Sequence, residues 1–255
     1  MDTKVLLVGS GGREDAIARS IVNSNGILYS VMAHKNPSIS RMSREFLICS
    51  EIDYKRIIDY CISTNIDIVF VGPDPVLETP LVDELLKRGI TVASPTREAA
   101  RIETSKAFMR DLLSKYNVNG NIEYHKFYSR DDVEKFMNSF GGDVAVKPIG
   151  LTGGKGVKVM GEQLKDRGEA IQYADHLIQS DGMVLIEEKI EGEEFSLQAF
   201  TDGKDLAFMP IVQDYKKAYE GDKGPNTGGM GSISDKNFSL PFLSSKAKDS
   251  AESTM

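Results

Sequence analysis

The stretch Lys147-Pro148-Ile149-Gly150-Leu151-Thr152-Gly153-Gly154-Lys155-Gly156-Val157 decides how the second half of this chain is interpreted. The apolar runs Val144–Val146 and Val157–Met160 flank it and predict two strands, so the glycine-rich segment predicts a β-hairpin turn. Glycines let backbone N–H groups turn toward a bound anion, because no Cβ restricts the backbone. With two lysines beside those amides, the stretch favours polyphosphate binding, and a plain solvated turn is the alternative.

Composition and charge restrict the class of protein. The chain has 255 residues, 40% hydrophobic and 27% charged, which is ordinary for a globular protein of one to three domains. The net charge of −7 argues against general binding to nucleic acid or to an anionic membrane. No apolar run is long enough to span a membrane, no signal-peptide pattern opens the chain, and Cys49 and Cys61 lack metal-type spacing. We therefore expect a cytoplasmic protein with buried, reduced cysteines.

Strands and helices alternate through the first hundred residues. Apolar runs at 4–8, 28–33, 67–71 and 90–93 predict strands, and helical patterns follow Glu14 and cover 53–64 and 77–87. Ser94-Pro95-Thr96 predicts the start of another helix. This alternation predicts a doubly wound, mostly parallel sheet.

Three turns follow the carboxyl ends of these strands, at the edge where open α/β sheets bind ligands. They are Gly9–Glu14, His34–Ser38 and Gly72–Pro75. The first turn leads into a helix N-terminus, which attracts anions through its N–H groups and dipole. It departs from G-x-G-x-x-G at Glu14, so a phosphate or phosphosugar is favoured over a dinucleotide. A purely structural turn is the alternative.

The pattern changes at Ile102–Thr104, where we place a domain boundary. The helix predicted for 105–115 has Lys106 in its first turn, where the helix dipole disfavours a positive charge. This placement suggests that an anion binds nearby, and a solvated lysine is the alternative. An acidic run, Glu187–Glu194, lies between two apolar strands, so strand alternation would turn some of its carboxylates inward. Gly224–Gly231 has four glycines in eight residues and predicts a loop for backbone contact rather than a flexible linker.

Together these segments resemble the ATP-grasp enzymes, and among them most closely the phosphoribosylamine–glycine ligases, also called glycinamide ribonucleotide synthetases. The matching segments cover nearly the whole chain and are Gly9–Glu14, Val71–Asp74, Pro95–Thr96, Ser105–Phe108, Lys147, Gly150–Val157, Glu187–Glu188, Gly192–Glu194, Gln213–Asp214 and Gly224–Gly231. The last of these is highly specific to these ligases. The resemblance implies an α/β fold with an N-terminal doubly wound parallel-sheet domain at 1–103. An incomplete α+β ATP-grasp domain would follow at 104–255, with a lid subdomain at about 120–190.

The resemblance also implies a nucleotide site. ATP would be bound by Lys106, Lys147, Gly153, Gly154, Lys155, Gly156, Glu187, Glu188, Ile190 and Glu194. The lysines would hold phosphates, and residues 153–156 would close over them as a lid. Adenine would contact Glu187 and the backbone of Glu188 and Ile190, while Glu194 would bind the ribose.

The same resemblance implies two substrate sites. Phosphoribosylamine would face Gly11, Gly12, Arg13, Glu14, Pro73 and Asp74, and glycine would be activated beside Asp214, Asn226, Thr227, Gly228 and Gly229. The catalytic residues would be Lys147, Lys155 and Asp214. The implied reaction forms glycyl phosphate from ATP and glycine. The amine of 5-phosphoribosylamine then displaces phosphate, giving glycinamide ribonucleotide, ADP and phosphate in purine biosynthesis.

The sequence departs from the family at Asp15, where many members have histidine, at Ile149, where many have aspartate, and in length. The family uses Mg²⁺ or Mn²⁺, and the segment that binds this metal there follows the part matched here. We therefore expect no metal ligands within this chain, little or no activity from it alone, and a separate C-terminal chain as a candidate partner. The alternatives are a module that only binds nucleotide, another ATP-grasp ligase, and an NAD-dependent oxidoreductase, which the broken glycine fingerprint disfavours.

Overall fold

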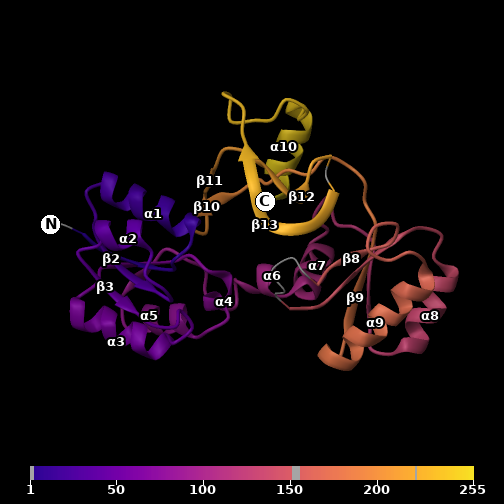
Figure 1. Ribbon diagram of the computed structural model, residues 1–255, viewed down its shortest axis with the longest axis horizontal. Coiled ribbons are helices and arrows are strands. Elements are labelled where there is room, and N and C mark those ends of the chain that lie inside the picture. The colour runs from indigo at the N-terminus through magenta and orange to yellow at the C-terminus, as the bar shows by residue number, and fades with distance from the viewer. Residues whose placement is uncertain (1–2, 151–155, 222) are drawn as a thin grey trace. The chain divides into compact units, whose positions relative to one another are not determined.

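The computed structural model describes residues 3–150, 156–221 and 223–255. It divides into two compact units, Met1–Met109 and Arg110–Met255, and each is described separately (Figure 1). Both mix helices with sheets, which confirms the predicted α/β class. Within the described residues, no helix combines the length and the apolar character needed to cross a membrane.

The first unit contains a parallel sheet with the strand order β3-β2-β1-β4-β5. Its strands are β1 (Lys4–Val8), β2 (Ile27–Met32), β3 (Glu45–Ile48), β4 (Ile68–Val71) and β5 (Thr91–Val92). Val8 is in register with both Val31 and Val71, so β1, β2 and β4 end at the same edge of the sheet. The chain therefore has the doubly wound sheet that the alternating pattern predicted.

Helices cover both faces of this sheet, with α1 and α2 on one face and α3 and α5 on the other (Figure 1). The helices are α1 (Gly12–Asn23), α2 (Pro37–Met42), α3 (Tyr54–Thr64), α4 (Asp74–Leu77), α5 (Leu81–Lys87), α6 (Arg101–Thr104) and α7 (Lys106–Lys115), the last of which continues into the second unit. The single helix predicted for 77–87 is divided at Pro80, which lacks the N–H that a continuous helix needs. The helix expected to start at Ser94-Pro95-Thr96 begins only at Arg101.

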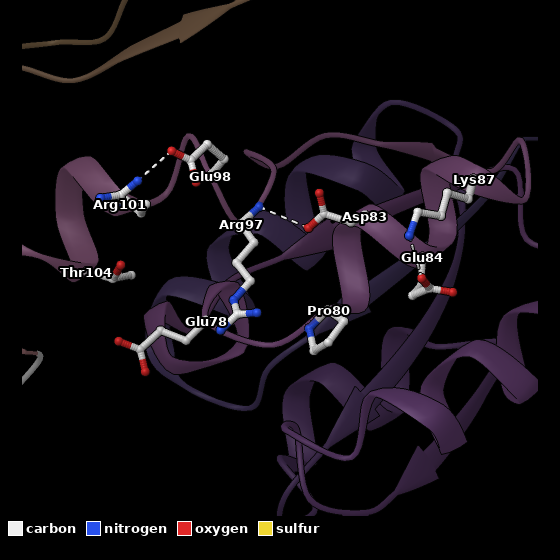
Figure 2. Close-up of a pocket in the computed structure, with 9 residues that line it drawn as sticks. All are labelled: Glu78, Pro80, Asp83, Glu84, Lys87, Arg97, Glu98, Arg101 and Thr104. Atoms are coloured by element: carbon white, nitrogen blue, oxygen red, sulfur yellow. Dashed lines mark hydrogen bonds and ion pairs between the residues drawn. The ribbon is translucent and has the colours of Figure 1, made fainter.

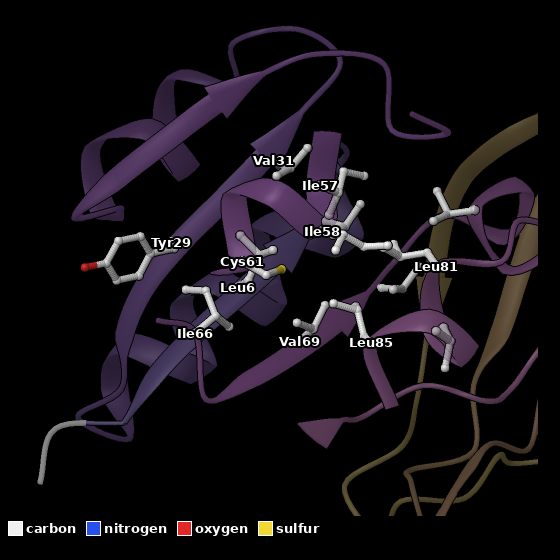
Figure 3. Packing of buried hydrophobic residues seen from close by; sticks show 14 of the residues in the cluster. Leu6, Tyr29, Val31, Ile57, Ile58, Cys61, Ile66, Val69, Leu81 and Leu85 are labelled. Atoms are coloured by element: carbon white, nitrogen blue, oxygen red, sulfur yellow. The ribbon is translucent and has the colours of Figure 1, made fainter. Parts of the chain in front are cut away.

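The core of the first unit follows from strand alternation, because successive side chains of β1 point to opposite faces. Leu6 and Val8 pack toward α3 and α5, whereas Leu7 packs toward α1 and α2. Figure 3 shows the first of these clusters, in which Ile57 and Cys61 of α3 are fully buried. Burial raises the pKa of the Cys61 thiol to about 12, so this cysteine stays protonated at neutral pH.

The second unit begins with an antiparallel sheet whose strands have the order β6-β9-β7-β8. Its elements are β6 (Tyr124–Phe127), α8 (Arg130–Ser139), β7 (Val144–Lys147), β8 (Lys158–Val159), α9 (Arg167–Asp181) and β9 (Val184–Glu188). Helices α8 and α9 lie side by side on one face of the sheet (Figure 1). Val144, Val146 and Ile186 point toward these helices, so the alternate residues Lys147 and Glu187 point to the opposite face.

The remaining elements are short antiparallel pairs and a helix. They are β10 (Ala199–Thr201), β11 (Leu206–Phe208), β12 (Gln213–Tyr219), β13 (Lys223–Ile233) and α10 (Ser245–Thr254). The loop predicted for Gly224–Gly231 is wrong, because this segment lies within β13 and pairs with β12. Its glycines and proline disfavour a strand by intrinsic preference, but the cross-strand pairing overrides that preference, and irregular register between the strands accommodates the segment.

Candidate functional site

The three turns at the strand ends of the first unit lie together, as their positions in the sequence predicted. The side-chain amide of Asn36 donates to the carbonyl oxygen of Ser10 at 3.1 Å, which joins the second turn to the first. Arg13 joins the first turn to the third, because its guanidinium donates to the Gly72 carbonyl at 2.5 Å and lies 3.7 Å from Asp74. Pro73 precedes α4 as its N-cap residue. This edge of the sheet therefore brings a helix N-terminus and an arginine to one place.

Glu14 links the residues at this edge of the sheet through hydrogen bonds and close packing. Its side chain is almost fully buried and accepts hydrogen bonds from the Gly11 N–H at 2.8 Å and from Arg13 Nε at 3.1 Å. It passes between Gly9 and Gly72, where a Cβ on either glycine would overlap the Glu14 side chain. The expected substrate residues Gly11, Arg13 and Glu14 thus bond to one another, and Gly12 begins α1 beside them.

Replacing Gly72 by alanine is expected to lower the free energy of unfolding by about 1–3 kcal/mol, because the added methyl group would displace the buried Glu14 carboxylate. Urea denaturation of the purified protein measures this change. Gly12→Ala is the matched control, since nothing lies within 4 Å of the Cβ that it adds. Equal stability of the two variants would contradict this account of Glu14.

The departure from the family at Asp15 is accompanied by a compensating charge. Arg19, one helical turn later, donates from Nε to the Asp15 carboxylate at 2.8 Å and from Nη2 to the Ser38 hydroxyl oxygen at 2.9 Å. Hydrogen bonding from Ser38 and Arg19 lowers the pKa of Asp15. The extra carboxylate at this edge is therefore paired with a guanidinium.

A second cluster lies on the face of the β6-β9-β7-β8 sheet opposite to α8 and α9. Lys147 at the end of β7 places its ammonium 2.5 Å from a carboxylate oxygen of Glu187 in β9. Arg110 of α7 binds both oxygens of the same carboxylate, at 2.7 and 3.0 Å. The side chain of Glu187 is 1% exposed, that of Arg110 13% and that of Lys147 23%, so Lys147 is the member most open to a ligand.

The electrostatics of this cluster are decided by the two cations. Burial alone would raise the pKa of Glu187, but the hydrogen bonds and charges of Arg110 and Lys147 outweigh it and lower that pKa. Glu187 therefore stays ionised at neutral pH. Two positive groups share one negative group, which leaves the cluster with a surplus positive charge.

Arg110 was not predicted from the sequence, although a local signal for it is present. Lys106 begins α7, and Arg110 follows four residues later, so helical spacing puts both on one side of the helix. The partner of Arg110 is 77 positions away along the chain, which no local pattern reveals. Its guanidinium also contacts the side-chain oxygen of Asn121 at 3.3 Å.

The remaining residues expected at the nucleotide are spread over several elements. The backbone N–H of Glu188 already donates to the Glu123 carbonyl at 3.0 Å, so it is engaged within the sheet. Ile190 is exposed just after β9. The carbonyl of Gly156 accepts from the Tyr173 hydroxyl at 2.8 Å. Gly153, Gly154 and Lys155 lie outside the described residues.

The residues expected at the glycine site gather around β12 and β13. Asp214 and Glu194 both approach the ammonium of Lys216, at 3.6 and 3.8 Å. Thr227 donates from its hydroxyl to the Lys216 carbonyl at 2.9 Å and accepts from the N–H of Gly229 at 3.1 Å. Asn226 pairs with β12, and Gly228 follows in the same strand. Strand pairing thus places Asp214 opposite Ser232, and Asn226 opposite Lys217.

A cleft of about 890 Å³ in the first unit contains none of the expected binding residues (Figure 2). It is lined by Glu78, Pro80, Asp83, Glu84, Lys87, Arg97, Glu98, Arg101 and Thr104. Lys87 pairs with Glu84 at 2.9 Å and Arg101 with Glu98 at 2.6 Å, so much of its charge is neutralised internally. This balance gives the cleft no evident preference for a polyphosphate.

A divalent cation needs ligands such as carboxylates, imidazoles or thiolates close to one another. Within 3–150, 156–221 and 223–255, no three side chains of His, Cys, Asp or Glu are grouped so that they could hold a metal ion. Asp214 and Glu194 both lie near the Lys216 ammonium, at 3.6 and 3.8 Å. The part of the chain that the structure describes therefore contains no ready-made group of three such ligands.

Comparison with solved structures defines the class of protein. The phosphoribosylamine–glycine ligase of Thermotoga maritima is 25% identical with a TM-score of 0.75, over 90% of this chain and 55% of that one. The biotin carboxylase domain of the Hydrogenobacter thermophilus 2-oxoglutarate carboxylase, solved with MgADP, ADP and bicarbonate, shares the fold. That domain is 15% identical with a TM-score of 0.69, over 85% of this chain and 51% of that one. Both share the fold of this chain, and the match of residues 104–255 to an ATP-grasp domain places the chain among proteins of the ATP-grasp type.

Comparison with protein families is more specific. Residues 3–103 match the phosphoribosylglycinamide synthetase N domain, and residues 104–255 match the ATP-grasp (A) domain of the same enzyme. The chain belongs to the phosphoribosylglycinamide synthetase family. It is 48% identical over 240 residues to the phosphoribosylamine–glycine ligase of Pyrococcus horikoshii, covering 94% of this chain and 55% of that protein. The chain thus spans about half the length of the curated relatives it matches.

Proposed function

We propose that this chain binds ATP and supplies the nucleotide and substrate sites for the ligation of glycine to 5-phosphoribosylamine. The observation that carries the proposal is the Lys147–Glu187–Arg110 cluster, in which a partly exposed lysine holds surplus positive charge on the face of the sheet opposite to α8 and α9. Such a fixed cation suits an anionic phosphate chain. The family to which the chain belongs and the names of its relatives support the choice of ligase.

The proposed nucleotide site is organised around this cluster. Lys147 would contact the phosphates, and Lys106 and residues 153–156 would complete their binding. Adenine would lie beside the end of β9, near Glu187, Glu188 and Ile190, with the ribose near Glu194. Because the N–H of Glu188 is engaged with Glu123, adenine recognition would rely on other backbone groups of this segment.

The proposed substrate sites use the other two arrangements. Arg13 and the α1 N-terminus would receive the phosphoribosylamine, because a guanidinium and unpaired helix N–H groups both suit a phosphate. Asp214 with the Asn226–Gly229 segment would position glycine. The acid oxygen of glycine would attack the γ-phosphorus and release ADP. The amine of phosphoribosylamine would then attack the acyl carbon, lose a proton and release phosphate.

No side-chain nucleophile is needed for this reaction, so the demand on the protein is to position charge and exclude water from the acyl phosphate. A divalent cation, when bound, would neutralise phosphate charge. Among the described residues, no three side chains of His, Cys, Asp or Glu are grouped to hold such a cation.

The test separates nucleotide binding from the reaction. Calorimetry with ATP on the 255-residue chain is expected to show binding, and a folded sample that takes up no ATP would overturn the proposal. ADP release is then measured with ATP, glycine, 5-phosphoribosylamine and Mg²⁺. The assay uses the chain alone and the chain mixed with the remaining part of the Pyrococcus horikoshii relative. We expect little release from the chain alone, because it spans about half of that relative. Failure of both ATP-binding preparations to release ADP would overturn the ligase assignment.

A further inference from the structure

The Lys147–Glu187–Arg110 cluster contains one more cation than Glu187 needs. The carboxylate of Glu187 is almost completely removed from water, and a buried carboxylate without a partner is strongly unfavourable. Arg110 satisfies it with two hydrogen bonds, at 2.7 and 3.0 Å, which is the strong bidentate arrangement. Lys147 shares one of the oxygens that Arg110 already contacts.

The surroundings of Arg110 hold it at this carboxylate. Its guanidinium contacts the Asn121 side chain at 3.3 Å, on the side away from Glu187. The neighbouring Lys126 is bound to Asp111 at 2.7 Å, so it is already paired. Within the described residues, Arg110 and Lys147 are the two cations that form ion pairs with Glu187. If Lys147 turns to another anion, Arg110 is the group that keeps Glu187 neutralised.

We propose that Arg110 is a positioning residue that releases Lys147 for phosphate binding by remaining as the counter-ion of Glu187. The inference rests on the proposed function, because it takes the phosphates of ATP as the anion that Lys147 meets. Without Arg110, the buried carboxylate would depend on Lys147 alone. Moving the lysine ammonium to a phosphate would then leave Glu187 unpaired, and nucleotide binding would be weakened by that cost.

The experiment measures ATP affinity by calorimetry for the full chain and a set of variants. Arg110→Met keeps much of the side-chain volume but removes the charge, and is expected to raise the dissociation constant by about tenfold or more. Arg110→Lys preserves a counter-ion and is expected to stay within about threefold of the parent. The control Arg130→Met removes a half-exposed arginine that pairs with Glu134 on α8, and should leave affinity unchanged.

The decisive variant is the double substitution Arg110→Met with Glu187→Gln. It removes the carboxylate that would retain Lys147, so its ATP affinity is expected to lie within about threefold of that of the single variant Glu187→Gln, which a merely structural loss at Arg110 would not produce. If Arg110→Met fails to fold, the double variant still provides the test. It lacks both charges of the pair, so it leaves no buried carboxylate without its arginine partner.

Two results would overturn the inference while leaving the proposed function intact. One is a parent protein that binds ATP and an Arg110→Met variant that binds it equally well. The other is a folded double variant that binds ATP tenfold more weakly than Glu187→Gln alone, which would show that Arg110 acts on the nucleotide itself. A folded parent protein without ATP binding would instead reject the proposed function and this inference with it.

Discussion

Replacing Lys147 by alanine is expected to weaken ATP binding by roughly a hundredfold, the loss typical of removing one partner of a desolvated charge pair. The structure gives the reason, because the Lys147 ammonium is the surplus charge of its cluster and the member most open to a ligand. Arg110 would remain with Glu187, so the substitution removes the phosphate contact without leaving a buried carboxylate unpaired. Calorimetric titration with ATP measures the change.

Lys158→Ala is the matched control for this prediction. Lys158 lies on the neighbouring strand β8, opposite Val146 in the register, and its ammonium lies 4.0 Å from the centroid of the Tyr173 ring in α9. It therefore faces the helices, whereas Lys147 faces Glu187. Its loss should change ATP affinity by less than about twofold, since its ammonium contacts Tyr173 on the face covered by the helices and not the Lys147–Glu187–Arg110 cluster. Equal effects of the two substitutions would mean that the ligand-binding face of the sheet has been assigned wrongly.

Replacing Glu187 by glutamine is expected to lower the free energy of unfolding by about 3 kcal/mol at pH 7. The substitution keeps the shape of the side chain but leaves Arg110 and Lys147 close together without an anion between them. Both cations are largely covered, so solvent can compensate only in part. Urea denaturation followed by circular dichroism measures the difference from the parent.

The pH dependence of this difference provides a second check. The pKa of Glu187 is lowered in the folded protein, so the carboxylate contributes stability above the unfolded-state pKa and loses it as the pH falls through the folded-state pKa. The gap between parent and variant should therefore narrow in acid. Glu134→Gln, at an exposed helical pair, is the control and should cost less than about 0.5 kcal/mol. A Glu187→Gln variant as stable as this control would contradict the description of the cluster.

Much of the fold could be predicted because the signals are local. Apolar runs placed the strands, and the helical pattern at 53–64 placed α3, in which Ile57 and Cys61 are buried. The short elements α2 and β3 were not predicted. Asn36 caps α2 by accepting from two backbone N–H groups, and Pro37 follows at its first position, so that signal was present in the sequence.

The candidate site could be predicted only for residues whose role is indicated by the residues next to them in the sequence. The glycine turns and Lys147 were found from their own sequence context, whereas the contact of Arg110 with Glu187 depends on the packing of α7 against the sheet. The prediction of a loop at Gly224–Gly231 was wrong for a related reason. Its strand is held by pairing with β12, and intrinsic preference contains no information about that partner. The roles of these residues toward ATP, glycine and phosphoribosylamine stay predictions.

The passage of Glu14 between Gly9 and Gly72 also has an evolutionary consequence. Three positions, separated by up to 63 residues in sequence, share one small volume, so the fitness effect of a change at one depends on the residues at the other two. A larger residue at position 72 would become tolerable only after position 14 had shortened, and restoring the glutamate afterwards would then be blocked. Such epistasis makes the order of mutations along a lineage matter at this edge of the sheet.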